Sequence, residues 1–228
     1  MLGGTGHVGA AVLAGLARAG VPAWFTYFAN TARADELARA GHRAHRLDLR
    51  RADDIRALLG EMAMAGCVPD VLIHCAAHPD WRSLEELDDA GWDDVQAVGV
   101  RAAFVAVQAL APRLAGRAAD IVLCAGLSAV RPVPAHVQAA AAHAGLAGLT
   151  RSFARALGPK KIRINLLALG ILDGGTANRI DAGFARDHLR FAALGRTGTA
   201  DEVARAILWL ALENTYVSGM VVPVAGGI

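Results

Sequence analysis

The chain has 228 residues, 54% of them hydrophobic and 19% charged, which is enough apolar length to bury the core of one large α/β domain. A formal charge of +2, with the arginines scattered along the chain, argues against a nucleic-acid-binding surface. The first residues lack the charged and apolar regions of a signal peptide, and no stretch approaches the ~18 uninterrupted apolar residues of a membrane span, so we expect a soluble, cytoplasmic protein without a membrane anchor.

Short apolar runs typical of strands alternate with segments of helical periodicity along the whole chain. The expected strands are 23–28, 45–49, 71–76, 121–125, 162–168 and 220–224. The expected helices run from the first glycines to Gly20 and then cover 34–40, 53–65, 84–88, 92–114 and 137–157, and a last one opens at 199–202 with the capping box Thr-Ala-Asp-Glu. This alternation predicts an α/β fold with a Rossmann-type, doubly wound parallel sheet, arranged as three layers in a single domain over residues 1–228.

The start of the chain departs from this plan. A doubly wound sheet has a central strand leading into its glycine loop, but only Met1 and Leu2 precede Gly3. We therefore expect the first strand to be truncated, with an upstream start missing from this sequence. The alternative is a fold that tolerates the gap and the unpaired strand edges it would leave.

The segment Gly3-Gly4-Thr5-Gly6-His7-Val8-Gly9 places glycines three residues apart at the start of a helix. Such glycines allow a tight turn and a close approach of the backbone to a diphosphate, whose charge the amides at the helix N-terminus favour. Alone, this pattern is a weak indication, because glycine-rich turns are common.

Three cysteines, Cys67, Cys75 and Cys124, show no C-x-x-C spacing. We interpret them as small, mostly buried residues rather than as a disulfide or a metal site. Cys124 at a strand end is a conceivable nucleophile, but the sequence indicates no partner base, and no metal site is expected.

Several further stretches carry a family resemblance. They lie at 47–49, 70–77, 145–150, 157–165, 195–199 and 217–228, in the same order as in the family. With the glycine loop, they make the chain resemble the short-chain dehydrogenase/reductase family, above all its β-ketoacyl-carrier-protein reductases. The resemblance implies a dinucleotide cofactor and a small-molecule ketone substrate.

The resemblance also implies which residues hold the cofactor: Gly3, Gly6, Gly9, Asp48, Leu49, Ala76, Gly170 and Leu172. His7 stands at the family's middle glycine, where it would either face solvent or contact phosphate. The second strand ends without the acidic residue that binds the ribose hydroxyls of NAD, and Arg33 follows. NADP(H) is therefore favoured over NAD(H), with a surface role for Arg33 as the alternative.

The family reduces carbonyls with an asparagine, a serine, a tyrosine and a lysine, but the resemblance aligns these places with Gly99, Gly126, Ala139 and His143. Glycine and alanine side chains cannot donate a proton, and general acid catalysis typically contributes about 10²–10⁴-fold. Ser128 and His143 remain as candidate replacements. Each also has a structural alternative: Ser128 as a local backbone partner and His143 as a packing residue.

Three functions stay open. The first is a non-canonical NADP(H)-dependent ketoreductase, with the proton supplied by a hydroxylated aromatic, polyketide-like ketone. The second is a catalytically inactive subunit that pairs with an active reductase paralogue, in a dimer or tetramer built through 92–114, 137–157 and 217–228. The third, with the least support, is a cyclase or dehydratase that uses His143, Asp80 and Asp173.

Overall fold

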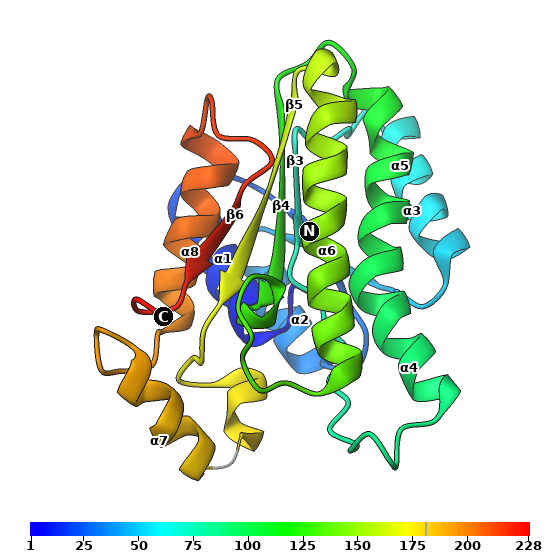
Figure 1. Ribbon diagram of the computed structural model, residues 1–228. Coiled ribbons are helices and arrows are strands. Elements are labelled where there is room, and N and C mark those ends of the chain that lie inside the picture. The colour runs from blue at the N-terminus through cyan, green and yellow to red at the C-terminus, as the bar shows by residue number, and fades with distance from the viewer. Residues whose placement is uncertain (181) are drawn as a thin grey trace.

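The sheet is parallel throughout and lies between two layers of helices (Figure 1). This computed structural model describes residues 1–180 and 182–228. The strands are β1 (Trp24–Tyr27), β2 (Arg43–Arg46), β3 (Val71–His74), β4 (Ala119–Gly126), β5 (Ile162–Leu169) and β6 (Val221–Val224). β2 pairs with β1, and β3, β4, β5 and β6 pair in that order. The expected doubly wound, Rossmann-type fold is confirmed.

Residues 1–4 join these two sets of strands into one layer. The amide of Leu2 donates to the carbonyl of Ile73 at 2.8 Å, and its carbonyl accepts from Cys75 at 3.0 Å. On the other side, Thr26 donates to Met1 and accepts from Gly4, both at 2.9 Å. The segment before the glycine loop therefore occupies the central position of the sheet, so no gap separates β1 from β3 at this level.

The helices follow the strands as a right-handed α/β alternation requires. They are α1 (His7–Arg18), α2 (Thr31–Arg39), α3 (Ala52–Met64), α4 (Asp89–Gln96), α5 (Ala102–Leu114), α6 (Val137–Leu157), α7 (Ala182–Phe191) and α8 (Ala200–Leu208). π-helical turns at Ala97–Arg101 and Trp209–Glu213 extend α4 and α8. The capping box of α8 is confirmed, since Thr199 accepts from the amide of Glu202 and Glu202 accepts from that of Thr199.

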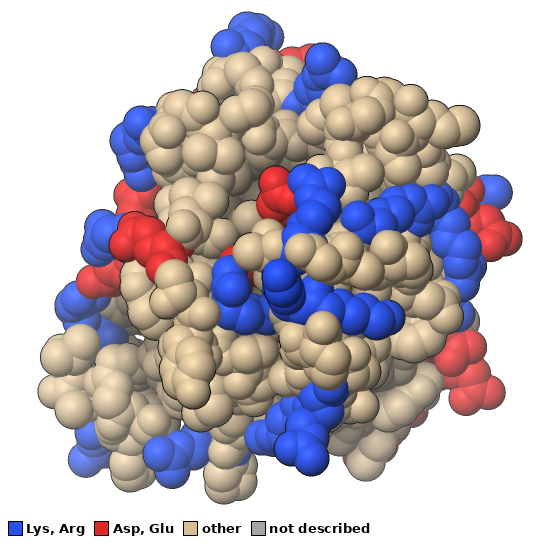
Figure 2. All heavy atoms as spheres, turned by 90° about the horizontal axis from the view of Figure 1, so that it is seen from above, with Lys and Arg blue, Asp and Glu red and all other residues tan. Residues whose placement is uncertain are grey.

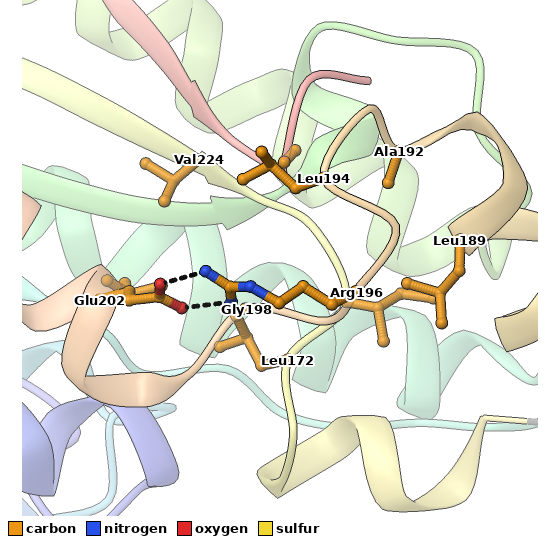
Figure 3. Close-up of a pocket in the computed structure, with 12 residues that line it drawn as sticks. Leu172, Leu189, Ala192, Leu194, Arg196, Gly198, Glu202 and Val224 are labelled. Atoms are coloured by element: carbon orange, nitrogen blue, oxygen red, sulfur yellow. Dashed lines mark hydrogen bonds and ion pairs between the residues drawn. The ribbon is translucent and has the colours of Figure 1, made fainter.

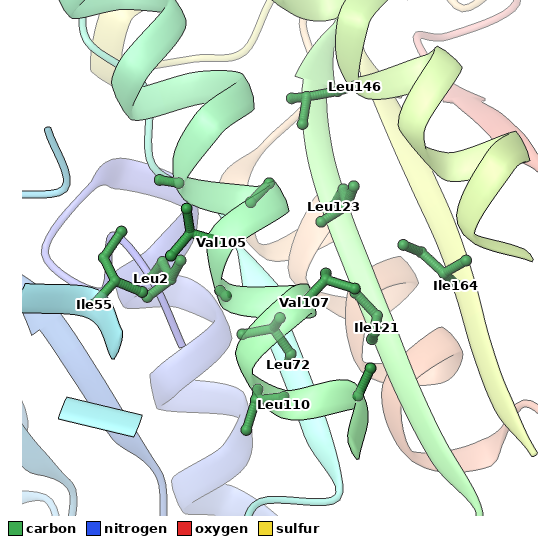
Figure 4. Close-up of a cluster of buried hydrophobic side chains, with 14 of the residues drawn as sticks. Leu2, Ile55, Leu72, Val105, Val107, Leu110, Ile121, Leu123, Leu146 and Ile164 are labelled. Carbon is green, nitrogen blue, oxygen red and sulfur yellow. The ribbon is translucent and has the colours of Figure 1, made fainter. Parts of the chain in front are cut away.

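Each face of the sheet carries its own hydrophobic core. α3, α5 and α6 cover one face with side chains such as Ile55, Val105 and Leu110 packed against Leu72 and Ile121 (Figure 4). α1 and α8 contribute to the core on the other face. Burial of one such side chain contributes about 1.5–3 kcal/mol, so these two cores hold the strand ends in register.

The continuous helical segment Asp89–Leu114 is long and apolar enough, by composition, to cross a membrane. In this fold, 61% of its most apolar window is buried inside the protein. It packs against α3 and α6, as a core helix of an α/β domain does.

Three sequence expectations differ from the structure. Residues 84–88 form a turn rather than a helix, because Glu86 accepts from the amide of Ser83 and Asp88 serves as the N-cap of α4. β2 begins two residues earlier than expected. Its first residue, Arg43, donates its backbone N–H to the carbonyl of Ala23, directly before β1. α7 was not expected at all.

The surface at the amino ends of the strands differs from the surface at their carboxyl ends. Seen from the amino ends of the strands, the surface gathers lysine and arginine side chains (Figure 2). Arg155, Lys161 and Tyr216 line a hollow there of about 540 Å³, together with Arg163, which pairs with Asp120. The loops that carry the predicted cofactor residues lie at the opposite, carboxyl edge, where ligands of open α/β sheets bind.

Candidate active site

The glycine loop forms a close-packed cradle at the carboxyl edge of the sheet. Gly3 adopts φ +82°, and a β-carbon there would lie 2.7 Å from the backbone of Ala76. A β-carbon on Gly9 would lie 2.2 Å from the carbonyl oxygen of Gly3, whereas one on Gly6 would meet only an ordinary contact at 3.5 Å. The loop therefore needs glycine at Gly3 and Gly9 for packing, which brings the α1 N-terminus and its amides to the surface where a diphosphate would lie.

His7 ties this loop to the segment after β5. Its Nε2 donates to the carboxylate of Asp173 at 3.1 Å, and its ring lies against Gly174 and Gly175. A β-carbon on Gly174 would be 2.7 Å from the imidazole. The ring therefore connects the glycine loop to the segment after β5 and stays about 30% exposed, while its contact with a phosphate remains a prediction.

The expected adenine end of the site is rich in arginine. The carboxylate of Asp48 accepts side-chain hydrogen bonds from Nε and one terminal nitrogen of Arg50, and these hold the pKa of its carboxyl below the usual value. Arg33 is exposed in the first turn of α2, and Arg46 at the end of β2 donates to the carbonyl of Phe28. Leu49, by contrast, is buried in the core. The carboxylate of Asp48 is thus neutralised beside a set of cationic side chains.

Gly99, which the resemblance aligns with the family's asparagine, lies in the π-helical turn between α4 and α5. Its carbonyl accepts a 2.9 Å hydrogen bond from Nε2 of His74, which is fully buried at the end of β3. Burial lowers the pKa of His74 to about 4, so the ring is neutral and the Nε2 tautomer is fixed by this bond. The Nδ1 atom of His74 is buried without a hydrogen-bond partner in the described protein.

Ser128, Gly126 and His143 come together at the end of β4. Ser128 lies in a 3₁₀ turn directly after the strand, and its Oγ hydrogen-bonds to Nδ1 of His143 on α6 at 2.7 Å. A β-carbon on Gly126 would lie 2.6 Å from Cε1 of the same ring. The imidazole therefore fills the space that any side chain at Gly126 would need.

Burial lowers the pKa of His143 to about 4. At neutral pH the imidazole therefore carries no charge and presents one donor and one acceptor nitrogen. Ala139, at the tyrosine place one turn earlier on α6, presents only a methyl group. The arrangement can hold a carbonyl oxygen through a hydroxyl and relay a proton, but it holds no positive charge of its own.

A segment that sequence analysis did not link to the site is fixed beside α6. Gln138 is fully buried, and its amide donates to the carbonyls of Asp80 and Arg82 at 3.2 and 3.4 Å. Arg82 in turn binds Asp80 and Asp88, and its hydrogen bonds lower the pKa of Asp80 to about 2. Asp80 is therefore a structural anion, which leaves little scope for it as an acid or base.

Leu172 and Gly170 follow β5. The amide of Gly170 donates to the carbonyl of Val224, and a β-carbon on it would lie 2.9 Å from Ala225. Leu172 lines a mainly apolar cavity of about 140 Å³, with Leu194 and Val224 among the other residues that line it (Figure 3). The bidentate pair of Arg196 with Glu202 lies in the same wall (Figure 3). None of the residues that line this cavity is Ser128, Ala139 or His143.

The structure adds four residues that sequence reasoning missed: Arg46, Asp173 as the partner of His7, His74, and Gln138. The carboxyl ends of β2 and β3 were signals for the first and third, since residues at such ends point toward the ligand edge. Across the described ranges, no three His, Cys, Asp or Glu side chains cluster as a metal site would require.

Comparisons with known proteins concern the family and the fold. The model of a family described as enoyl-(acyl carrier protein) reductase matches residues 6–228. A 3-oxoacyl-(acyl-carrier-protein) reductase of Chlamydia muridarum is 28% identical over 165 residues, 72% of this chain and 62% of that enzyme. The match thus spans less than two thirds of that reductase's length.

Two further proteins are similar over more of their length. A probable galactose dehydrogenase of Rhizobium meliloti is 31% identical over 93% of this chain and 87% of its own. The crystal structure of a short chain dehydrogenase from Burkholderia cenocepacia in complex with NADP has a TM-score of 0.87 and 29% identity, and covers 99% of this chain and 95% of that one.

Proposed function

The chain belongs to the short-chain dehydrogenase/reductase family, and from this premise we propose that it is an NADP(H)-dependent carbonyl reductase with a substituted proton-transfer site. Its substrate would be a hydroxylated aromatic, polyketide-like ketone. The family membership supports oxidoreductase chemistry, while the substituted residues require a proton route of their own.

The cofactor assignment rests on the carboxyl edge of the sheet. Gly3, Gly6 and Gly9 offer a close-packed cradle for the diphosphate. Arg33 and Arg46 lie near the end of β1, where a 2′-phosphate would need cationic partners and where no carboxylate follows the strand. The Burkholderia relative carries NADP in its crystal structure, which supports the same cofactor here.

The observation that carries the proposal is the 2.7 Å hydrogen bond between Ser128 and His143. The family's serine place holds a glycine, but Ser128 offers a hydroxyl two residues later, and His143 holds it in position. NADPH would supply the hydride to the carbonyl carbon. Ser128 would hold the carbonyl oxygen, and a bound, correctly oriented ketone already gains much of the rate advantage that proximity provides.

The proton's source follows from the electrostatics. With a pKa of about 4, His143 is a neutral imidazole at neutral pH and lacks the extra proton of an imidazolium. It can only pass one along a hydrogen-bonded chain to Ser128, so a donor must come from the substrate or from solvent. A phenol adjacent to the ketone would provide such a donor inside the site, and Ala139 offers only a methyl group there.

Turnover with NADPH tests the proposal. We expect purified protein to oxidise NADPH in the presence of hydroxylated quinones or other hydroxyaryl ketones, and Ser128→Ala to lower kcat more than it raises KM. Binding of NADPH, measured by calorimetry, should be unchanged in that variant. Absence of both NADPH binding and turnover across such a panel would overturn the proposal.

A second candidate, an inactive subunit, is supported by the exposed apolar surface. Phe104 on α5 stacks on Phe153 of α6 at 6.2 Å and remains 39% exposed. Trp209, Tyr216 and Met220 near the C-terminus are exposed as well. Members of this family assemble through such helices and this C-terminal segment, so the chain would pair with itself or with an active reductase paralogue.

Size-exclusion chromatography distinguishes the two candidates. If the chain is an inactive subunit, co-expression with a neighbouring reductase should give a mixed oligomer, and the mixture should be more active or more stable than either partner alone. Elution as separate homo-oligomers, with NADPH oxidation by this chain alone, would exclude the second candidate.

A further inference from the structure

Two thiols lie side by side beneath the cofactor cradle. Cys75 directly follows β3 and Cys124 lies in β4, and the register pairs His74 with Leu123, so the two cysteines are the next pair across the strands. Their sulfur atoms are 3.4 Å apart, and both side chains are half-buried on the sheet face that α1 and α8 cover.

The backbone already meets the spacing that a disulfide needs. Adjacent strands lie about 4.8 Å apart, within the roughly 4.4–6.8 Å range of Cα separations seen in disulfides. The sulfurs would have to approach from 3.4 Å to about 2.05 Å. Because the strands are held by hydrogen bonds on both sides, this approach strains the sheet, and strained disulfides are readily reduced again.

We propose that Cys75 and Cys124 form a reversible disulfide when the protein meets a peroxide. A sulfur of one cysteine attacks the peroxide and becomes a sulfenic acid, with release of water. The other sulfur then attacks the sulfenic sulfur and releases a second water. Two thiols are oxidised, one hydrogen peroxide is reduced, and a dithiol reductant reverses the change.

The order of attack follows from the surroundings of the two thiols. The hydrogen bond with Cys75 and burial both raise the pKa of the Cys124 thiol. Cys124 therefore stays protonated, so Cys75 is the sulfur that meets the peroxide first and Cys124 resolves the sulfenic acid. With the two sulfurs 3.4 Å apart, a protonated Cys124 can donate a hydrogen bond to the sulfur of Cys75.

The bond would act on the cradle through Ala76. Ala76 follows Cys75 in the chain, and its backbone lies against Gly3 so closely that a β-carbon on Gly3 would be 2.7 Å away. The carbonyl of Leu2, one residue before, accepts from the amide of Cys75 at 3.0 Å. A shift of Cys75 toward Cys124 therefore moves the floor of the glycine loop. This consequence rests on the proposed cofactor site, whereas disulfide formation does not.

The remaining cysteine of the chain, Cys67, lies in the loop before β3, outside the proposed pair, and its removal leaves only Cys75 and Cys124 as thiols. In a Cys67→Ala background, hydrogen peroxide should remove both remaining thiols from reaction with a thiol reagent. Intact mass should fall by two hydrogen atoms without dimer formation, and dithiothreitol should restore both thiols. Adding Cys75→Ala or Cys124→Ala should abolish the mass loss.

Cleavage at arginine and aspartate separates Cys67 from Cys75, so peptide mapping of the wild-type protein gives the same answer without any substitution. A linked peptide pair containing Cys75 and Cys124 is expected. Addition of oxygen atoms to either cysteine without a cross-link, or thiols that stay reactive after peroxide, would overturn the proposal.

Calorimetry with NADPH supplies the second readout. The oxidised Cys67→Ala protein should bind NADPH at least several-fold more weakly than the reduced protein, and dithiothreitol should restore the affinity. If the disulfide forms but affinity is unchanged, the effect on the cradle is wrong. If reduced protein binds no NADPH while the disulfide still forms, the proposed cofactor is wrong and the thiol pair stands.

Discussion

The imidazole of His143 occupies the space directly over Gly126, where a β-carbon would lie 2.6 Å from its Cε1 atom. The resemblance aligns these two residues with the family's lysine and serine, and their contact means that a side chain at one position limits the side chain at the other. A histidine reaches back toward β4 only if the strand position carries no side chain. With glycine at 126 and histidine at 143, the structure has a neutral imidazole that is hydrogen-bonded to Ser128. This arrangement differs from the family's serine and lysine in more than the loss of one side chain.

Gly126→Ala should destabilise the protein by about 1–3 kcal/mol, the usual cost of overpacking a filled site. The methyl group would push the ring of His143 aside and break its bond to Ser128. Urea unfolding measures the change. Gly60→Ala on α3 is the matched control, since no atom lies within 4 Å of a β-carbon there and alanine favours a helix.

A double-mutant cycle identifies the cause. Gly126→Ala should cost much less when His143 is already alanine, because the clashing ring is gone. Independent, additive effects of the two substitutions would show that the contact between this ring and Gly126 is not the source of the loss.

Acid should destabilise the fold through its buried histidines. Burial lowers the pKa of His143 and His74 from 6.5 to about 4. Between these values the unfolded chain binds more protons than the folded one, so stability falls as pH falls from 6.5 to about 4 and loses nothing further from these groups below that. Each tenfold change in proton affinity is worth about 1.4 kcal/mol, so each histidine accounts for up to about 3 kcal/mol.

Urea unfolding at several pH values across this window provides the measurement. His143→Gln keeps a polar side chain without the titration, so its stability should depend less steeply on pH than that of the wild-type protein. An identical slope in the variant would mean that His143 is protonated in the folded state.

Local and non-local features of the site differ in how far the sequence could predict them. The spacing of Gly3 and Gly9 and the capping box at Thr199 depend on neighbours within a few residues, and both were predicted. The contact of Ser128 with His143 joins two elements 15 residues apart and depends on how α6 lies against β4. The resemblance fixed the positions of both residues, but only the packing of that helix brings them together.

His7 and Asp173 show the same limit more strongly, since 166 residues separate them. Nothing near His7 in sequence indicates its partner. The predicted helix at 84–88 was wrong for a related reason. Arg82 forms ion pairs with Asp80 before it in the chain and with Asp88 after it, and these contacts compete with the helical periodicity of the segment. Side-chain contacts that the periodicity of the sequence does not indicate are present in both cases.

Arg46→Ala should weaken NADPH binding about tenfold or more and leave NADH binding unchanged, since a hydrogen bond to a charged group contributes about 1.5–3 kcal/mol. The reason is the loss of a cation near the end of β1, where the 2′-phosphate of NADPH would lie. Calorimetry with both nucleotides measures this. Arg39→Ala, in the last turn of α2, is the control. If Arg46→Ala weakens the affinity for NADPH and for NADH equally, Arg46 does not recognise the 2′-phosphate.

Asp173→Asn should tighten NADPH binding about two- to fivefold at low salt. The carboxylate is about half exposed and lies one hydrogen bond from His7 in the glycine loop, so it repels a diphosphate bound there. Salt should remove the difference, because screening weakens exposed charges. Asp53→Asn, on an exposed carboxylate of α3, should leave affinity unchanged. Weaker binding in Asp173→Asn would instead indicate that the ion pair with His7 builds the cofactor site.

Methylation of the substrate's phenol tests the source of the proton. If the phenol beside the ketone supplies it, the methyl ether should lower kcat by about 10²–10⁴-fold, the usual contribution of general acid catalysis, with a much smaller change in KM. The physical reason is that neither Ala139 nor neutral His143 can replace that donor at neutral pH. NADPH affinity serves as the control, because the cofactor does not contact the phenol's proton. If the ether and the phenol react at equal rates, the proton comes from solvent through Ser128 and His143, and Ser128→Ala should then abolish turnover of both substrates.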